Sequence, residues 1–198
     1  MVTETPEKHS SPKDYNRAAI KYIFREILAE DGKIDLDNPT YAPLPLTDGN
    51  YHAVLEYYQL AEHVMALRTK IITDTLEDVA STEYAFEDFG ELTIVSSVTE
   101  VSPAHRQKGI GSGLVALTDD IIMYGVFLIP GARDTLVSAA MVDAAEGEGI
   151  YREGKIIGRL GWTGQQLAKL GYEFHGLRNR DNQPIWIKQY HTPQWQSI

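Results

Sequence analysis

The segment Val101-Ser-Pro-Ala-His-Arg-Gln-Lys-Gly-Ile-Gly-Ser-Gly-Leu114 decides the fold of this chain. Residues 92–101, which lead into it, are rich in Ile, Val, Thr and Ser and predict a strand. From Gly109 to Tyr124 the apolar residues recur at helical spacing and predict an amphipathic helix. Because Pro103 ends the strand, a glycine-bearing loop must connect the two elements.

The loop has the composition of an anion-binding site. Glycines let a ligand approach the backbone closely, and the N–H groups at the start of a helix point into the loop with the positive end of the helix dipole. Arg106 and Lys108 add positive charge. We therefore predict a pyrophosphate cradle in a chain whose formal net charge is −10.

Two common phosphate motifs do not match the loop. A Walker A loop ends in Gly-Lys-Ser/Thr, and a Rossmann fingerprint reads G-x-G-x-x-G, whereas Gly109, Gly111 and Gly113 are each separated by one residue. The pattern resembles motif A of the GCN5-related N-acetyltransferase (GNAT) superfamily, V-x-P-x-x-R-x-x-G-x-G. The matching residues are Val101, Pro103, Arg106, Gly109 and Gly111. The segment Gln166–Tyr172 also resembles the K-x-G-F/Y element of that family.

The resemblance implies an α/β protein (layered α+β) with a mixed, mostly antiparallel central sheet flanked by helices. We divide the chain into an N-terminal extension, residues 1–38, and a GNAT-like acyl-CoA-binding domain, residues 39–198. The extension is expected to hold a disordered tail and one helix, Tyr15–Glu30, with Asp14 as its N-cap.

Apolar periodicity and turn residues predict the other elements. A long helical stretch, capped by Thr47 or Asp48 and continuing to about Val79, is expected as one helix or as two with a bend. A strand is expected at residues 135–142. The glycine-rich residues 143–161 are expected to form a loop. A short helix at Trp162–Leu170 and a hairpin of strands 172–178 and 184–190 complete the prediction.

In the family, acyl-CoA lies in a V-shaped gap where the motif A strand separates from the next strand. By motif position, the pantetheine arm would meet Thr99 and Val101, and Arg106 would take the basic position of the motif. The residues expected around the pyrophosphate are Gln107, Lys108, Gly109, Ile110, Gly111 and Ser112. The implied reaction is direct attack of an amine on the thioester of acetyl-CoA or another acyl-CoA, without a metal.

Two positions depart from the family pattern. Leu167 stands where many members carry a tyrosine that protonates the leaving thiolate, and Val95 stands where several carry a glutamate base. Glu91 could act as base through water, and Tyr151 or Tyr172 could replace the acid. A surface acid, a loop aromatic and a core aromatic are the simpler interpretations of these three residues.

The bulk composition indicates the environment and the partners. The chain has no cysteine, which removes disulfides and thiolate chemistry. Its acidity argues against nucleic acid, and it lacks the run of roughly 18 apolar residues that would cross a membrane. We therefore expect a cytoplasmic protein. Its histidines show no metal-binding pattern, although His105 could contact phosphate.

The stretch between Lys70 and Arg106 contains acids but no Lys or Arg. The acids are Asp74, Glu77, Asp78, Glu83, Glu87, Asp88, Glu91 and Glu100. Because this stretch borders the acceptor side of the cleft in the family, it predicts a cationic amine acceptor, either a small molecule such as a polyamine or a lysine side chain. The alternative is a solvated acidic face.

These observations leave three functions open. The preferred one is an acyl-CoA-dependent N-acyltransferase. The second is a catalytically silent GNAT-fold protein that acts as a binding or assembly component, and its K-x-G helix, with Leu167 at the tyrosine position, resembles that of GNAT-like proteins of tailed phages. In that case the N-terminal helix could dock on its own domain, on a second copy in a homo-oligomer, or on another partner. The third is a nucleotide-binding protein that uses the same loop.

Overall fold

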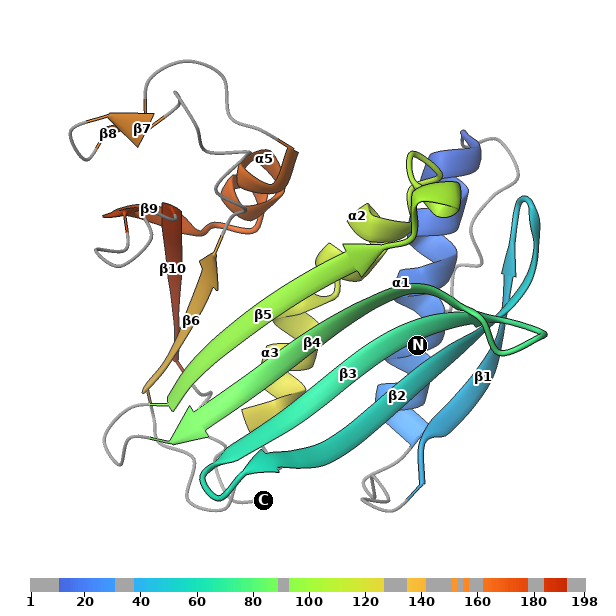
Figure 1. Cartoon of the computed structure of the whole chain (residues 1–198), viewed down its shortest axis with the longest axis horizontal. Helices are drawn as coiled ribbons and strands as arrows, with labels where there is room; N and C mark the ends of the chain where they lie inside the picture. Colours follow the sequence, from blue (N-terminus) through green and yellow to red (C-terminus); the bar gives the residue numbers. More distant parts are fainter. Residues whose placement is uncertain are drawn as a thin grey trace, which may run out of the picture.

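The computed structural model describes residues 11–30, 38–88, 93–126, 135–141, 151–152, 155–156, 162–177 and 184–191 (Figure 1). The helices are α1 (Pro12–Glu30), the short 3-10 turn η1 (Pro103–His105), α2 (Ile110–Val115), α3 (Thr118–Val126) and α5 (Trp162–Lys169). The first strands are β1 (Thr40–Leu46), β2 (Gly49–Ala61), β3 (Val64–Thr73), β4 (Asp78–Asp88) and β5 (Thr93–Val101). The later strands are β6 (Thr135–Met141), β7 (Tyr151–Arg152), β8 (Lys155–Ile156), β9 (Glu173–Leu177) and β10 (Pro184–His191).

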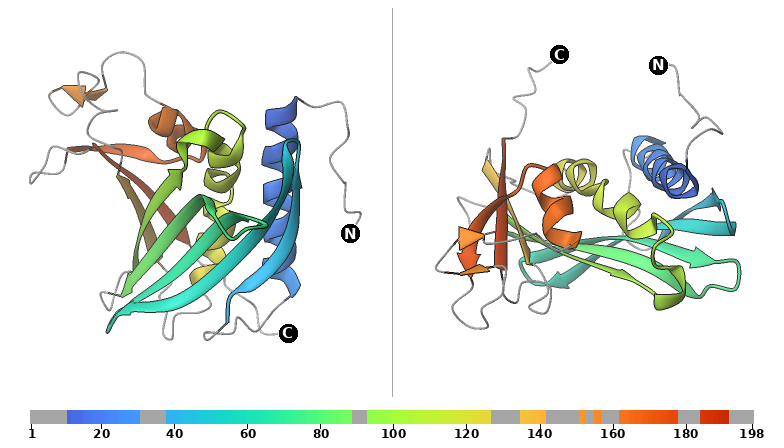
Figure 2. Two further views of the ribbon diagram at one scale, coloured as in Figure 1. Left: turned by 45° about the vertical axis from the view of Figure 1, so that its right-hand side comes forward. Right: turned by 90° about the horizontal axis from the view of Figure 1, so that it is seen from above.

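The main sheet has eight strands in the order β1-β2-β3-β4-β5-β6-β10-β9. Every neighbouring pair is antiparallel except β5 and β6, which run parallel. Helices α1, α2 and α3 lie on the same face of this sheet (Figure 2). The expected fold class, a mixed and mostly antiparallel sheet flanked by helices, is therefore confirmed.

The core lies between the sheet and these helices. Alternate strand residues such as Leu55, Leu67 and Tyr84 are buried toward the helices. On α1, the apolar stripe of Ile20 and Phe24 is fully buried in the same cluster. The surface that this helix requires is thus provided by its own sheet.

The start of α1 differs from the prediction. Asp14 was expected to be the N-cap, but the helix begins at Pro12. The Ser11 hydroxyl donates to a carboxylate oxygen of Asp14 at 2.7 Å, and the Asp14 amide donates back to the Ser11 hydroxyl at 3.3 Å. Ser11 is therefore the cap, and Pro12 is tolerated at the first helical position because its missing N–H would have no helical partner.

The predicted helical stretch from Thr47 to Val79 is wrong. This region forms the antiparallel strands β2 and β3 and the start of β4. The turn between Ala61 and Val64 contains only Glu62 and His63, so neither glycine nor proline marks it in the sequence. Without that mark, apolar residues on two strands were read as one helical stripe.

The other elements are close to their predicted bounds, with two changes. The helix expected from Gly109 to Tyr124 is divided into α2 and α3, and at the break the Leu117 amide donates to the Leu114 carbonyl at 3.0 Å. The expected loop at residues 143–161 contains the short β7–β8 hairpin. Among the described residues, no helix has the length and apolar composition to cross a bilayer.

Candidate functional site

The parallel strands β5 and β6 separate before β5 ends. Their pairing runs from Thr93–Leu136 to Ser97–Ala140. In the same register Val98 would stand opposite Met141, the last residue of β6, but the pair is not formed. On its other edge β5 stays paired with β4 as far as Val101. The end of β5, residues 98–101, therefore has an edge that β6 leaves open, and Figure 1 shows the two strands diverging there.

A cleft of about 880 Å³ is lined in part by the last residues of β5. Its walls come from α1, the start of β4, the end of β5 and the loop that follows. The site residues predicted from the sequence that line it are Thr99, Val101, Arg106, Gln107, Gly109, Gly111 and Ser112. The Thr99 hydroxyl lies 2.9 Å from the Thr82 hydroxyl, which fixes its orientation on the helix-covered face.

The loop presents a row of backbone donors to the cleft. Among the described residues, the amides of Gln107–Ser112 have no hydrogen-bond partner in the protein. Gln107 is held at a φ of 63°, a left-handed conformation that costs a residue with a side chain about 1–3 kcal/mol. Unpaired donors in a constrained backbone can bind the oxygens of an anion.

Two glycines of this segment, Gly109 and Gly113, pack against α1. A β-carbon on Gly109 would lie 2.4 Å from the carbonyl oxygen of Lys13, and one on Gly113 would lie 2.9 Å from Ile20 Cδ1. Gly109 also has a φ of 85°, which favours glycine. Since α2 has only six residues, the field of its dipole is a minor contribution beside the amides themselves.

Asn16 is the residue that fixes α1 against this loop, and the sequence analysis did not select it. Its side chain is 1% exposed. Its amide nitrogen donates to the Lys108 carbonyl at 2.9 Å, and its amide oxygen accepts from the Thr47 amide at 2.9 Å. A polar residue one turn before Ile20 on the apolar stripe was the signal that could have identified it.

Positive side chains from distant parts of the chain meet at the cleft. Lys13 and Arg17 come from α1, and Arg106 comes from the loop. Arg106 Nε donates to the Val101 carbonyl at 3.2 Å, which holds its stem at the end of β5. Among the described residues, neither Lys13 nor Arg106 has a carboxylate partner.

Two residues expected at the pyrophosphate do not turn their side chains to the cleft. Lys108 Nζ lies 2.7 Å from an Asp48 carboxylate oxygen, and this hydrogen bond raises the pKa of the lysine. The Ile110 side chain is buried in the core, so only its backbone could contact a ligand. His105 lies just before this loop, with its Nδ1 2.8 Å from the Ser102 hydroxyl.

The structure describes only some of the residues proposed as general acid and base. Glu91 and the side chain of Tyr151 lie outside the described residues. Tyr172 is buried, with its hydroxyl 3.5 Å from that of Tyr190. Leu167 packs against Tyr172, and Val95 is fully buried in the main core. Neither of these two family positions holds a group that could exchange a proton.

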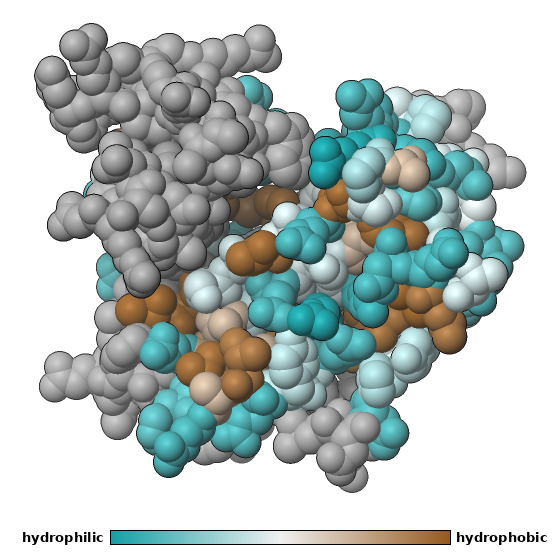
Figure 3. Space-filling model, viewed as in Figure 1, coloured by the Kyte–Doolittle hydropathy of each residue, from teal (hydrophilic) through white to brown (hydrophobic). Residues whose placement is uncertain are grey.

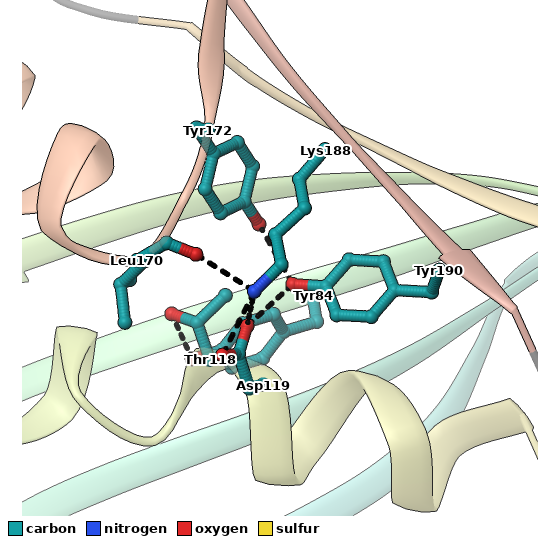
Figure 4. A network of polar contacts seen from close by, with 7 residues as sticks. All are labelled: Tyr84, Thr118, Asp119, Leu170, Tyr172, Lys188 and Tyr190. Carbon is teal, nitrogen blue, oxygen red and sulfur yellow. Dashed lines mark hydrogen bonds and ion pairs between the residues drawn. The ribbon is translucent and has the colours of Figure 1, made fainter.

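A polar network connects β10, beyond the point where β5 and β6 separate, to α3 and β4 (Figure 4). Lys188 Nζ lies 2.8 Å from Asp119 Oδ1 and donates to the Leu170 carbonyl at 2.7 Å. The Tyr190 hydroxyl donates to the same Asp119 oxygen at 2.6 Å. These contacts connect β10 and the turn after α5 to the first residues of α3.

The network lies close to the point where β5 and β6 stop pairing. Tyr84 pairs with Ser97, the last β5 residue that pairs with β6, and its hydroxyl lies 3.3 Å from the Thr118 hydroxyl. Burial raises the pKa of Tyr84 and of Tyr190 well above their usual range. Both phenols are therefore protonated at neutral pH.

The acids of the predicted acceptor region are divided between two surfaces. Asp78 and Glu100 line the cleft, and Asp78 forms an ion pair with Lys70 at 2.7 Å. Glu83 lies on the face of the sheet opposite the helices, where it is bound by Arg68 and Tyr58. Figure 3 shows that face as a mixture of polar and apolar side chains. Within the described part of the chain, no group of His, Asp and Glu is arranged to hold a metal.

No protein-family model and no curated protein matches this chain. Among solved structures it is similar to mutant forms of the spermidine/spermine N-acetyltransferase SpeG from Vibrio cholerae, with 10% identity, a TM-score of 0.37 and 64% of each chain covered. It is also similar to the PaiA N-acetyltransferase from Thermoplasma acidophilum in complex with coenzyme A, with 13% identity, a TM-score of 0.36, and 63% of this chain and 61% of that chain covered. The chain therefore spans less than two thirds of the length of these two proteins.

A GCN5-related N-acetyltransferase from Kribbella flavida is similar over more of its length. The match has 14% identity and a TM-score of 0.38, and it covers 90% of this chain and 93% of that chain.

Proposed function

We propose that this chain, which resembles the GNAT superfamily, is an acyl-CoA-dependent N-acyltransferase with acetyl-CoA as the donor. The observation that carries the proposal is the separation of β5 from β6 beside the free amides of Gln107–Ser112. The open edge of β5 can pair with the amide groups of a pantetheine arm. The loop amides and Arg106 can bind the diphosphate at the end of that arm.

The proposed reaction is direct transfer. The amine nitrogen attacks the thioester carbonyl, a C–N bond forms, the C–S bond breaks, and the thiolate takes up a proton while the amine loses one. Val95 and Leu167 cannot move either proton, so positioning would supply most of the rate. Tyr172 is the described candidate for the acid, and Glu91 and Tyr151 remain candidates for proton transfer.

The proposed acceptor is a cationic amine on a small molecule or a lysine side chain. The support is Asp74 and Glu77 at the β3–β4 turn, together with Glu100 at the cleft, whereas the neighbouring Asp78 is paired with Lys70. Such a group attracts an approaching cation once the cation is within the screening length of the salt.

A catalytically silent acyl-CoA-binding protein is the second candidate. The specific support is the burial of Leu167 and Val95 in apolar clusters. Both functions require the same donor site, so a binding experiment tests what they share. An activity experiment separates them.

The binding experiment follows thermal unfolding as acetyl-CoA is added to wild type, Ser112→Asp and Ser112→Ala. The Ser112 hydroxyl donates to the Gly109 carbonyl at 2.9 Å, so both substitutions remove the same bond. Only the aspartate places a negative charge among the free amides. Wild type and Ser112→Ala are expected to be stabilised by acetyl-CoA, and Ser112→Asp is not. Equal stabilisation of a folded Ser112→Asp variant would contradict the loop as the diphosphate site.

The activity experiment measures free thiol released from acetyl-CoA with a panel of polyamines, aminoglycosides and lysine peptides. Release that depends on the amine supports the transferase. Binding of acetyl-CoA without release from any amine supports the silent protein. Glu91→Gln, Tyr151→Phe and Tyr172→Phe, compared by their pH–rate profiles, then assign the proton transfers.

A further inference from the structure

We infer that helix α1 is a wall of the ligand site, where Lys13 and Arg17 bind a phosphate monoester that the ligand carries in addition to its diphosphate. The inference rests on the proposed acyl-CoA function and deepens it. It assigns a binding role to a helix that lies before the segment matched by the GNAT motif. It also predicts discrimination between coenzyme A and dephospho-coenzyme A, which lacks the monoester.

The first support is the distribution of charge. Most of the described cations outside the cleft have a carboxylate partner. These pairs are Arg25–Asp120, Arg68–Glu83, Lys70–Asp78, Lys108–Asp48 and Lys188–Asp119. At the cleft, Lys13 and Arg106 have no such partner among the described residues. In a chain with a net charge of −10, unpaired cations that come from two different segments and line one cleft indicate an anionic ligand.

Arg17 is also largely available to a ligand. Among the described residues, its one carboxylate partner within 4 Å is Asp14, at 3.9 Å, and the two side chains are 48% and 58% exposed. A pair that long and that exposed contributes little stability. Of the two described acids that line the cleft, Asp78 is paired with Lys70, so Glu100 is the described acid that opposes the three cations.

The second support is the rigid placement of α1 on the loop. Lys13 and Arg17 are one helical turn apart and therefore lie on the same side of α1. The Lys13 backbone contacts Gly109, and Asn16, between the two cations, is bonded to the Lys108 carbonyl. The part of the α1 backbone that carries the two cations is thus held at a fixed position relative to the free amides of the loop.

The cleft offers two kinds of hydrogen-bond donor, neutral backbone amides and charged side chains, and these suit two kinds of phosphate group. A diphosphate diester is matched by the row of amides and by Arg106. A phosphate monoester carries about −1.5 to −2 charges near neutral pH and favours additional cations over neutral donors. Lys13 and Arg17 are the cations that α1 adds to the cleft, and coenzyme A carries such a monoester on its ribose.

The experiment measures the Kd of coenzyme A and of dephospho-coenzyme A by calorimetry. The proteins are wild type, the double variant Lys13→Gln/Arg17→Gln, and the control Lys21→Gln. Lys21 lies one turn beyond Arg17 on the same side of α1 and does not line the cleft. Melting without ligand checks that each variant folds, and the single variants are used if the double variant melts early.

Wild type and Lys21→Gln are expected to bind coenzyme A about tenfold more tightly than dephospho-coenzyme A. The double variant is expected to lose this preference while it keeps its affinity for dephospho-coenzyme A. Equal affinities in wild type, or a preference that persists in the double variant, would overturn the role of α1. If wild type binds neither ligand, the proposed function fails as well.

Discussion

The carbonyl oxygen of Lys13 lies 2.4 Å from the point where Gly109 would carry a β-carbon. These residues are far apart in the sequence, one in the first helix and one in the motif loop. The contact means that α1 and the loop form one packed unit. It also means that Gly109 is required by the protein whether or not a ligand is bound.

Gly109→Ala is therefore expected to destabilise the protein by about 2–4 kcal/mol, because the left-handed backbone and the contact with Lys13 both oppose a methyl group. Gly171→Ala is the matched control, since Gly171 has a similar φ of 81° but nothing within 4 Å of the added atom. The control should cost only about 1 kcal/mol. Urea unfolding measures both values, and equal losses would show that α1 does not pack on the loop.

Asn16→Leu is expected to destabilise the protein by about 1–3 kcal/mol, because it leaves the Lys108 carbonyl and the Thr47 amide without their partner. Asn50→Leu, at an exposed position near the start of β2, is the comparison. Hydrogen exchange should show faster exchange of the Thr47 amide in Asn16→Leu alone. An unchanged rate there would contradict the assigned bond.

Lys188→Met and Asp119→Asn should each lower stability by about 1–3 kcal/mol, because each breaks the connection between β10 and the start of α3. The two losses should not add in the double variant, since the residues are in direct contact. A thermodynamic cycle from urea unfolding gives the coupling. Strict additivity would mean that the contact in Figure 4 contributes nothing.

Glu83 should make stability depend on pH in acid. Its hydrogen bond with Tyr58, and then its bond and ion pair with Arg68, lower the pKa of the Glu83 carboxyl below its ordinary value of 4.5. The folded state therefore binds this proton less readily than the unfolded state, and the stabilisation is present above pH 4.5. It is lost as the pH falls through the lower, folded value.

Glu83→Gln should accordingly flatten the acid limb of the stability curve, and Glu87→Gln, at an exposed position of the same strand, should leave it unchanged.

On the alkaline side, burial and then Glu83 raise the pKa of Tyr58 to about 12. Stability from this group is lost as the pH rises from 10 toward 12, and Tyr58→Phe should remove that loss. Parallel curves for wild type and both variants would contradict the two bonds.

Much of the region around the motif could be predicted because its signals are local. Pro103 ends β5, and the residues from Gly109 begin a helix. The break at Leu117 was missed because the apolar stripe continues through it. The β2–β3 hairpin was missed because Glu62 and His63 carry no turn signal, so burial on the sheet, rather than local preference, selected strands.

The sequence alone determined the loop between Val101 and Gly109, the fold class and the apolar stripe of α1. These features could be predicted because glycine, proline and apolar periodicity act within a few residues. Only the tertiary structure decided that α1 lies on that loop, that Lys13 and Arg17 face the cleft, and that β6 leaves β5 after Ser97. Those outcomes depend on contacts between distant segments, such as Asn16 with Lys108. A contact of this kind has no local pattern, because each partner satisfies the other only after the chain has folded.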